Sequence, residues 1–151
     1  MMIATESVPF TTLFDGVLAS INNVVPLPYV SQDPRLHEDQ LKLQFGVLIG
    51  FTGGLKGKIL FKADKDVFSR LGEAMFGMPL EGDMLVSFAG ELGNMIAGGL
   101  CTNVFGQGLT IDITSPTIME GESKISGFKK AMELSVTFQE KGDLFMYFLL
   151  D

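Results

Sequence analysis

The chain has no tryptophan, one cysteine and one histidine among its 151 residues. A single cysteine, Cys101, excludes an internal disulfide and a cysteine-rich zinc site, and it is typical of a reducing compartment. A lone histidine gives little support to nucleophilic catalysis by a Cys–His pair. Basic residues are also few: the chain has 11 Lys and Arg and 18 Asp and Glu, which gives a formal net charge of −7. So acidic a domain is a poor partner for nucleic acid or for an anionic membrane surface.

Long apolar runs and targeting signals are absent as well. The apolar stretches end well short of the ~18 residues that a membrane span needs. The first ten residues, MMIATESVPF, lack the basic and apolar regions of a signal peptide. We therefore expect a cytoplasmic protein with no membrane partner. Hydrophobic residues make up 46% of the chain, which excludes a disordered polymer and predicts one domain over residues 1–151.

Hydrophobic periodicity predicts an α+β fold. Apolar residues recur at spacings of three and four in a predicted helix over 8–25. Asp64 as N-cap and Gly77 as stop signal predict a short helix over 64–77, and a second long helix follows over 84–101 with Asp83 as its N-cap. Alternating or apolar runs predict the strands 41–49, 56–63, 109–114, 132–138 and 143–150. We expect loops at 26–40 and around Pro116. The predicted fold is an antiparallel sheet of about five to six strands, with two long helices and one short helix layered on it.

The predicted strand 143–150 is apolar on both of its sides. Leu144, Met146 and Phe148 point one way, while Phe145 and Tyr147 point the other. Such a strand has to be covered on both faces. We expect helices on one face, and either loops, a second helix layer or another subunit on the other.

The predicted helix 84–101 carries an unusual stripe. At 100° per residue, its polar and small residues gather on one side: Ser87, Glu91, Asn94 and Gly98. Its apolar residues gather toward the core: Leu85, Phe88, Leu92, Met95 and Ile96. Glu91 and Asn94 are one turn apart and point the same way. The flanks of the stripe are small residues: Gly90, Gly93, Ala97 and Cys101.

Four glycines inside this helix weaken it. Gly90, Gly93, Gly98 and Gly99 each cost roughly 1 kcal/mol relative to alanine. The sum, ~4 kcal/mol, is large against a total stability of about 5–15 kcal/mol. Close approach of another helix, or of a partner protein, to the backbone would offset this loss. The alternative is a solvated face with incidental glycines, stabilised by tertiary packing.

The first predicted helix echoes part of this pattern. Asp15, Ala19 and Asn22 have the same i, i+4, i+7 spacing and lie 72 residues before Ser87, Glu91 and Asn94. An internal duplication of a helix plus a hairpin would explain the echo, and it predicts two pseudo-duplicated halves. Three polar positions can also recur by chance, so this echo alone does not establish a duplication.

Ser87, Glu91, Asn94 and Pro116 together form a longer pattern. It reads Ser or Asp, three residues, Glu, two residues, Asn, about twenty-one residues, Pro, with GELGNMIAGG around its core. This pattern resembles that of the CheC/CheX/FliY phosphatases of bacterial chemotaxis, and the resemblance extends over nearly the whole chain. CheC proteins carry two such motifs. Here Ala19 stands where the first glutamate would be, so the chain looks more like CheX.

The resemblance implies dephosphorylation of a phosphorylated CheY-type response regulator. It assigns Glu91 and Asn94 as catalytic, and Ser87, Gly90 and Gly98 as the surface that docks on the partner. The regulator supplies Mg²⁺, and the chain needs no cofactor or metal of its own. Because an aspartyl phosphate is labile, the phosphatase only has to orient a water molecule in line with the phosphorus atom. The Asn94 carboxamide suits that role, and Glu91 can pair with a partner lysine.

The resemblance also implies a homodimer with strand exchange between subunits. The alternative function is a non-catalytic interaction or scaffold module of chemotaxis or the flagellar switch on the same fold, and the intact Glu91 and Asn94 favour the phosphatase. No cluster of polar residues in the sequence supports a third function, the binding of a small molecule. His37 stands beside Glu38 and Asp39, where a metal site is conceivable, but we expect a solvated loop.

Overall fold

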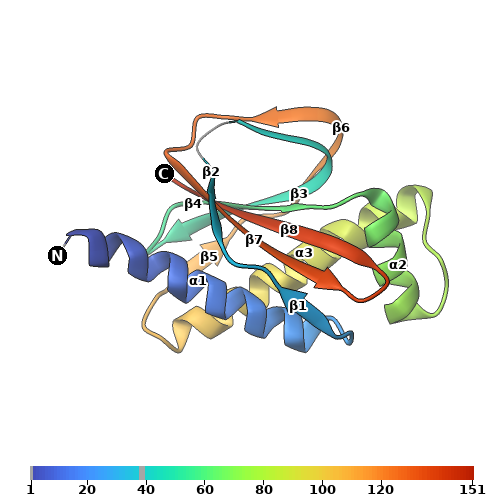
Figure 1. Ribbon diagram of the computed structural model, residues 1–151, viewed down its shortest axis with the longest axis horizontal. Helices are drawn as coiled ribbons and strands as arrows, with labels where there is room; N and C mark the ends of the chain where they lie inside the picture. Colours follow the sequence, from blue (N-terminus) through green and yellow to red (C-terminus); the bar gives the residue numbers. More distant parts are fainter. Residues whose placement is uncertain (1, 38–39) are drawn as a thin grey trace.

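The computed structural model describes residues 2–37 and 40–151, and within this part three helices lie on one sheet (Figure 1). The helices are α1 (Met2–Val24), α2 (Lys65–Phe76) and α3 (Gly82–Phe105). The strands are β1 (Tyr29–Ser31), β2 (Arg35–His37), β3 (Leu41–Gly53), β4 (Gly57–Lys62), β5 (Ile111–Ile113), β6 (Thr117–Ile125), β7 (Lys130–Phe138) and β8 (Gly142–Leu150). The predicted α+β class is confirmed.

The sheet is built from two antiparallel hairpins that meet in its middle. Its strand order is β1-β7-β8-β4-β3-β5, with β2 also paired to β7 and β6 to β3. One hairpin, β3–β4, follows α1 along the chain, and the other, β7–β8, follows α3. The two hairpins join along β4 and β8. Each half is therefore a long helix plus a hairpin, as the echo between the two helices predicted.

The described residues hold more strands than the five to six expected, because segments predicted as loops pair with the sheet. β6 lies antiparallel along β3 in the segment after Pro116. Its sequence, TIMEGESKI, is polar and contains a glycine, which an edge strand tolerates. β1 and β2 are three residues each and pair with β7. Strands this short leave no periodic signal in a sequence.

Two helices are longer than predicted. α1 begins six residues before the predicted residue 8, so Pro9 lies inside the helix rather than in its first turn. α3 begins at Gly82, has Glu81 rather than Asp83 at its N-cap, and continues to Phe105. Asp83 lies in the first turn, where its negative charge interacts favourably with the helix dipole.

Helix α2 has the N-cap residue that was predicted. Asp64 occupies this position. Gly77 ends the helix with a φ of 79°, a left-handed conformation that glycine adopts without steric cost, and its N–H donates to the carbonyl of Glu73. The chain then returns to the start of α3, so the end of α2 and the start of α3 lie side by side, with the Phe76 ring against the Phe88 ring.

Both faces of the sheet are covered by this chain. The helices enclose the main core on one face, and β3 and β6 curve over the other (Figure 1). A register shift between Leu43 and Phe45 accompanies the bend in β3. The second face holds a smaller cluster: Leu41, Leu43, Leu60, Ala131, Tyr147 and Leu149. Strands of the same chain thus cover the two-sided strand β8, in place of the loops, helix layer or second subunit expected.

The two long helices pack with their backbones in close approach. A Cβ built on Gly99 would lie 2.2 Å from Ser20 Oγ. Ser20 is buried, and its hydroxyl donates a hydrogen bond of 2.7 Å to the Ile96 carbonyl. Asn103 Nδ2 donates to the Gly16 carbonyl at 2.8 Å. At Gly99, helix–helix packing therefore offsets the loss of helix propensity, which is one of the two explanations considered from the sequence.

Helix α3 is long and apolar enough to cross a membrane by length and composition alone. Ten of its residues are nevertheless buried inside this domain. Its apolar face therefore has a partner in the core, and the apolar composition of the helix needs no membrane to explain it.

Gly98 and Gly99 provide a matched test of this packing, because a Cβ on Gly98 meets nothing within 4 Å. We expect Gly99→Ala to lower the free energy of unfolding by about 2 kcal/mol, since its methyl group would displace Ser20. Gly98→Ala should raise that free energy by about 0.5–1 kcal/mol, since alanine has the higher helix propensity. Urea unfolding followed by circular dichroism measures both. Equal effects of the two substitutions would contradict the close approach of α1 at Gly99.

Candidate functional site

The polar stripe of α3 lies on the side of the helix turned away from the core, as predicted. Ser87 and Glu91 are exposed, and Asn94 and Gly98 are half-buried. Leu92, on the opposite side, is buried in the main core. The helix thus presents a carboxylate and a carboxamide one turn apart on a face that solvent reaches.

Ser87, Glu91 and Asn94 line a shallow hollow of about 350 Å³ between α3 and the start of β6. Its lining consists of Val86, Ser87, Gly90, Glu91, Asn94, Pro116 and Ile118. The fold therefore brings the distant Pro116 into the same hollow as the polar pair. Among residues 10–37 and 40–151, no hydrogen bond or ion pair engages the Glu91 carboxylate or the Asn94 carboxamide. Both groups are available to another molecule.

The two glycines assigned to docking have different surroundings. Gly90 is buried, and a Cβ on it would lie 3.1 Å from Ile118 Cδ1, so the missing side chain lets β6 approach α3. Gly98 lies at the open end of the stripe, with nothing within 4 Å of a built Cβ. Gly90 therefore shapes the wall of the hollow, while Gly98 keeps the outer face of the helix flat.

Met95, which was predicted in the core, is exposed. At 100° per residue its side chain lies about 40° from Glu91 around the helix, whereas that of Ile96 lies about 140° away. The prediction was wrong because hydrophobicity assigned Met95 to the core although it stands at the border of the stripe. It adds an apolar group to the edge of the site.

The echo of the motif in α1 does not form a second polar pair. Asp15, Ala19 and Asn22 are all exposed, but Ala19 has no carboxylate to place beside Asn22. Of the two helices, α3 therefore carries the intact pair.

Neither an activated cysteine nor a metal-binding cluster is found in the described part of the chain. Burial, and secondly the carboxylate of Asp112, raises the pKa of the Cys101 thiol above its ordinary value. The thiol is therefore protonated at neutral pH and is a poor nucleophile. No group of three or more His, Cys, Asp or Glu that could hold a metal ion occurs among the described residues.

A partly buried polar cluster on β2, β7 and β8 was missed from the sequence. His37 Nε2 donates to Glu133 Oε1 at 2.9 Å, and Glu133 is only 7% exposed. Burial, and then the hydrogen bond to Glu133, raises the pKa of the Tyr147 phenol. His37 thus joins β2 to the sheet instead of lying in a solvated loop, whereas Glu38 and Asp39 fall outside the described residues. His37 and Glu133 are 96 positions apart, so no local spacing predicts their contact.

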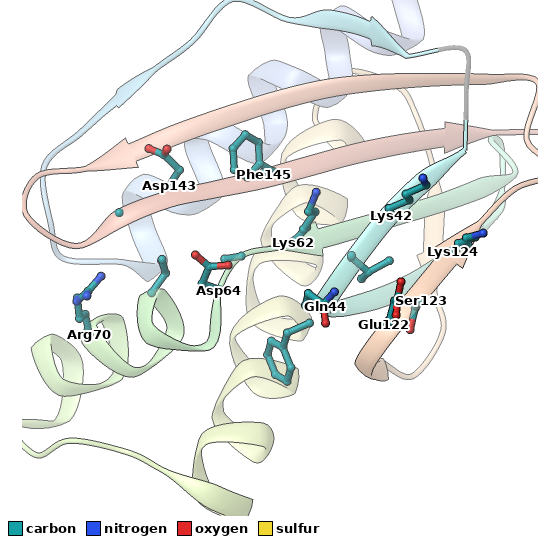
Figure 2. A pocket seen from close by; sticks show the side chains of 15 residues that line it. Lys42, Gln44, Lys62, Asp64, Arg70, Glu122, Ser123, Lys124, Asp143 and Phe145 are labelled. Carbon is teal, nitrogen blue, oxygen red and sulfur yellow. The ribbon is translucent and has the colours of Figure 1, made fainter.

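A larger hollow of about 570 Å³ lies elsewhere on the surface (Figure 2). Its lining combines charges of both signs: Lys42, Lys62, Arg70 and Lys124 with Asp64, Glu122 and Asp143. The Lys62 ammonium lies 5.9 Å from the centroid of the Phe145 ring. The lining comes from β3, β4, α2, β6 and β8, so sequence spacing could not reveal it. It shares no lining residue with the hollow at Asn94.

Comparison with known proteins gives the family. Residues 45–139 match the family described as chemotaxis phosphatase CheX. The chain belongs to the CheX family. A curated relative, the CheY-P phosphatase CheX of Thermotoga maritima, is 28% identical over 137 residues, which cover 87% of this chain and 88% of the relative. The resemblance to CheX drawn from Ser87, Glu91, Asn94 and Pro116 is therefore confirmed.

Solved structures share the fold of this CheX-family chain. A chemotaxis protein CheX from Desulfovibrio desulfuricans superimposes with a TM-score of 0.79 at 18% identity, covering 93% of this chain and 97% of that one. The CheX–CheY–BeF3–Mg²⁺ complex of Borrelia burgdorferi matches with a TM-score of 0.77 at 18% identity, covering 93% and 96%. The CheX-like fold predicted from the sequence is confirmed.

Proposed function

We propose that this chain hydrolyses the aspartyl phosphate of a CheY-type response regulator, with α3 docked on the regulator's active site. The observation that carries the proposal is that the exposed Glu91 and the half-buried Asn94 lie one turn apart in a solvent-open hollow that Pro116 completes. Family membership supports it, because the Thermotoga maritima relative is a CheY-P phosphatase and the Borrelia burgdorferi relative forms a complex with CheY, BeF3 and Mg²⁺.

Asn94 orients the attacking water in this proposal. Its carboxamide oxygen accepts a hydrogen bond from the water, and its NH₂ group donates to a phosphoryl oxygen. Water then attacks phosphorus in line, the bond between phosphorus and the aspartyl oxygen breaks, and inorganic phosphate leaves the regulator's free carboxylate behind. Because positioning and electrostatics supply most of the acceleration of phosphoryl transfer, no covalent intermediate on this chain is needed.

Glu91 fixes the register of docking. Its carboxylate is exposed and, among the residues with described side chains, unpaired, so it can form a charge-assisted hydrogen bond with a lysine of the regulator. Ser87 and Gly98 leave the helix face flat enough to approach the partner. The Mg²⁺ that the reaction requires belongs to the regulator, and no side chain of this chain is assigned to it.

We expect Asn94→Ala to lower the rate of phosphate release by on the order of 10²-fold, because the water loses its orienting group. The measurement is the decay of a phosphorylated CheY-type regulator, with circular dichroism to check folding. Asn22→Ala, at the corresponding exposed position of α1, is the matched control and should keep the wild-type rate. An Asn94→Ala protein that retains the wild-type rate would remove Asn94 from the mechanism. Unchanged decay with the wild-type protein would instead favour a non-catalytic interaction module.

Glu91→Ala should raise the half-saturation for the phosphorylated regulator by about tenfold, because the partner's lysine would lose its counter-charge on docking. Steady-state rates over a range of regulator concentrations measure the change. Glu122→Ala, which removes an exposed carboxylate from the larger hollow, is the control and should leave half-saturation unaltered. A lower saturated rate at unchanged half-saturation would assign Glu91 to the chemistry instead of to docking.

A further inference from the structure

An apolar groove of about 640 Å³ opens beside the proposed site, between the end of α2 and the start of α3. Its lining consists of Phe76, Met78, Leu80, Asp83, Met84, Ser87, Phe88 and Glu91. Three of these side chains are apolar and yet exposed: Phe76 at 64%, Met84 at 60% and Met78 at 53%. Exposed apolar side chains gathered in one groove mark an interaction surface.

Packing holds the groove in shape. The Phe76 ring meets the Phe88 ring edge-on, with centroids 5.7 Å apart and an interplanar angle of 86°. Leu80 is buried, and its carbonyl accepts a hydrogen bond of 2.9 Å from Ser69 Oγ on α2. Gly77 ends α2 in a left-handed conformation next to Phe76. The exposed ring of Phe76 is therefore held in place by its own helix end and by α3.

The groove is continuous with the hollow at Asn94. Ser87 and Glu91 line both of them, so a protein surface that reaches Glu91 from solvent also lies over the groove. The stripe itself offers little apolar area, because its exposed residues are Ser87 and Glu91. The single ion pair proposed for Glu91 contributes modest affinity, whereas a buried aromatic side chain contributes more. The polar stripe alone is thus poorly suited to hold the partner, and the groove beside it is well suited.

We propose that this groove is the docking surface for the response regulator, and that it receives apolar side chains from the rim of the regulator's phosphorylation pocket. The proposal rests on the function proposed above. Asp83 and Glu91 place negative charge at the edges of the groove, so the complementary rim is apolar with a basic group beside it. Asn94 acts on the phosphate, Glu91 fixes the register of docking, and the groove supplies most of the affinity for the regulator.

The test measures binding of a CheY-type regulator loaded with BeF3 and Mg²⁺, together with decay of the phosphorylated regulator, for Phe76→Ser and Met84→Ser. Phe105→Ser is the matched control, because Phe105 is 68% exposed at the far end of α3, about 27 Å along the helix from Ser87. We expect Phe76→Ser to raise the dissociation constant of the loaded regulator about tenfold and to raise the half-saturation by the same factor. The rate at saturating regulator should change by much less than tenfold. Phe105→Ser should alter neither quantity.

Each other outcome separates the alternatives. Wild-type binding by both Phe76→Ser and Met84→Ser would overturn the docking role of the groove, as would a wild-type protein that does not bind the loaded regulator. A wild-type protein that binds the loaded regulator but leaves phosphate decay unchanged would contradict the proposed hydrolysis alone. A wild-type dimer that dissociates on Phe76→Ser, seen by light scattering, would assign the groove to a second copy of this chain and overturn the proposal.

Discussion

Helix α3 is in close contact with its neighbours on several sides, and the exposure of its remaining side depends on this packing. α1 contacts it at Gly99, the sheet at Gly93 and β6 at Gly90, each where a Cβ would come too close to a neighbour. The helix loses propensity at these glycines and gains a fixed position in the fold. Its open side carries Glu91 and Asn94, so both groups are presented from a packed helix, as the proposed catalysis by positioning requires.

The sequence predicted the elements whose side chains repeat strongly. The stripe and apolar face in 84–101 indicated a core helix, and the two-sided strand 143–150 indicated a covered strand. Segment 117–125 was missed because an edge strand pairs on one side and carries polar residues, so its periodicity is weak. The cover of β8 was also missed, because it depends on the bend of β3. A register shift between Leu43 and Phe45 accompanies this bend, and the sequence pattern does not show it.

The candidate site was predictable where it lies on one helix. The periodicity of the α-helix alone places Glu91 and Asn94 on one face, whereas Pro116 entered through the family resemblance and joins them only in three dimensions. Met95 was placed wrongly because hydrophobicity does not locate the edge of a buried face. The groove at Phe76 could not be predicted, because it forms where the ends of two separate helices meet.

The most direct measurement is a map of the residues whose NMR signals change when a CheY-type regulator loaded with BeF3 and Mg²⁺ is added. We predict the largest changes at the side-chain amide of Asn94 and at the backbone of Ser87 and Glu91, with smaller changes when the regulator is unloaded. Changes centred on the hollow around Lys62, with the Asn94 amide unmoved, would contradict the claim that this face of α3 meets the phosphorylated pocket.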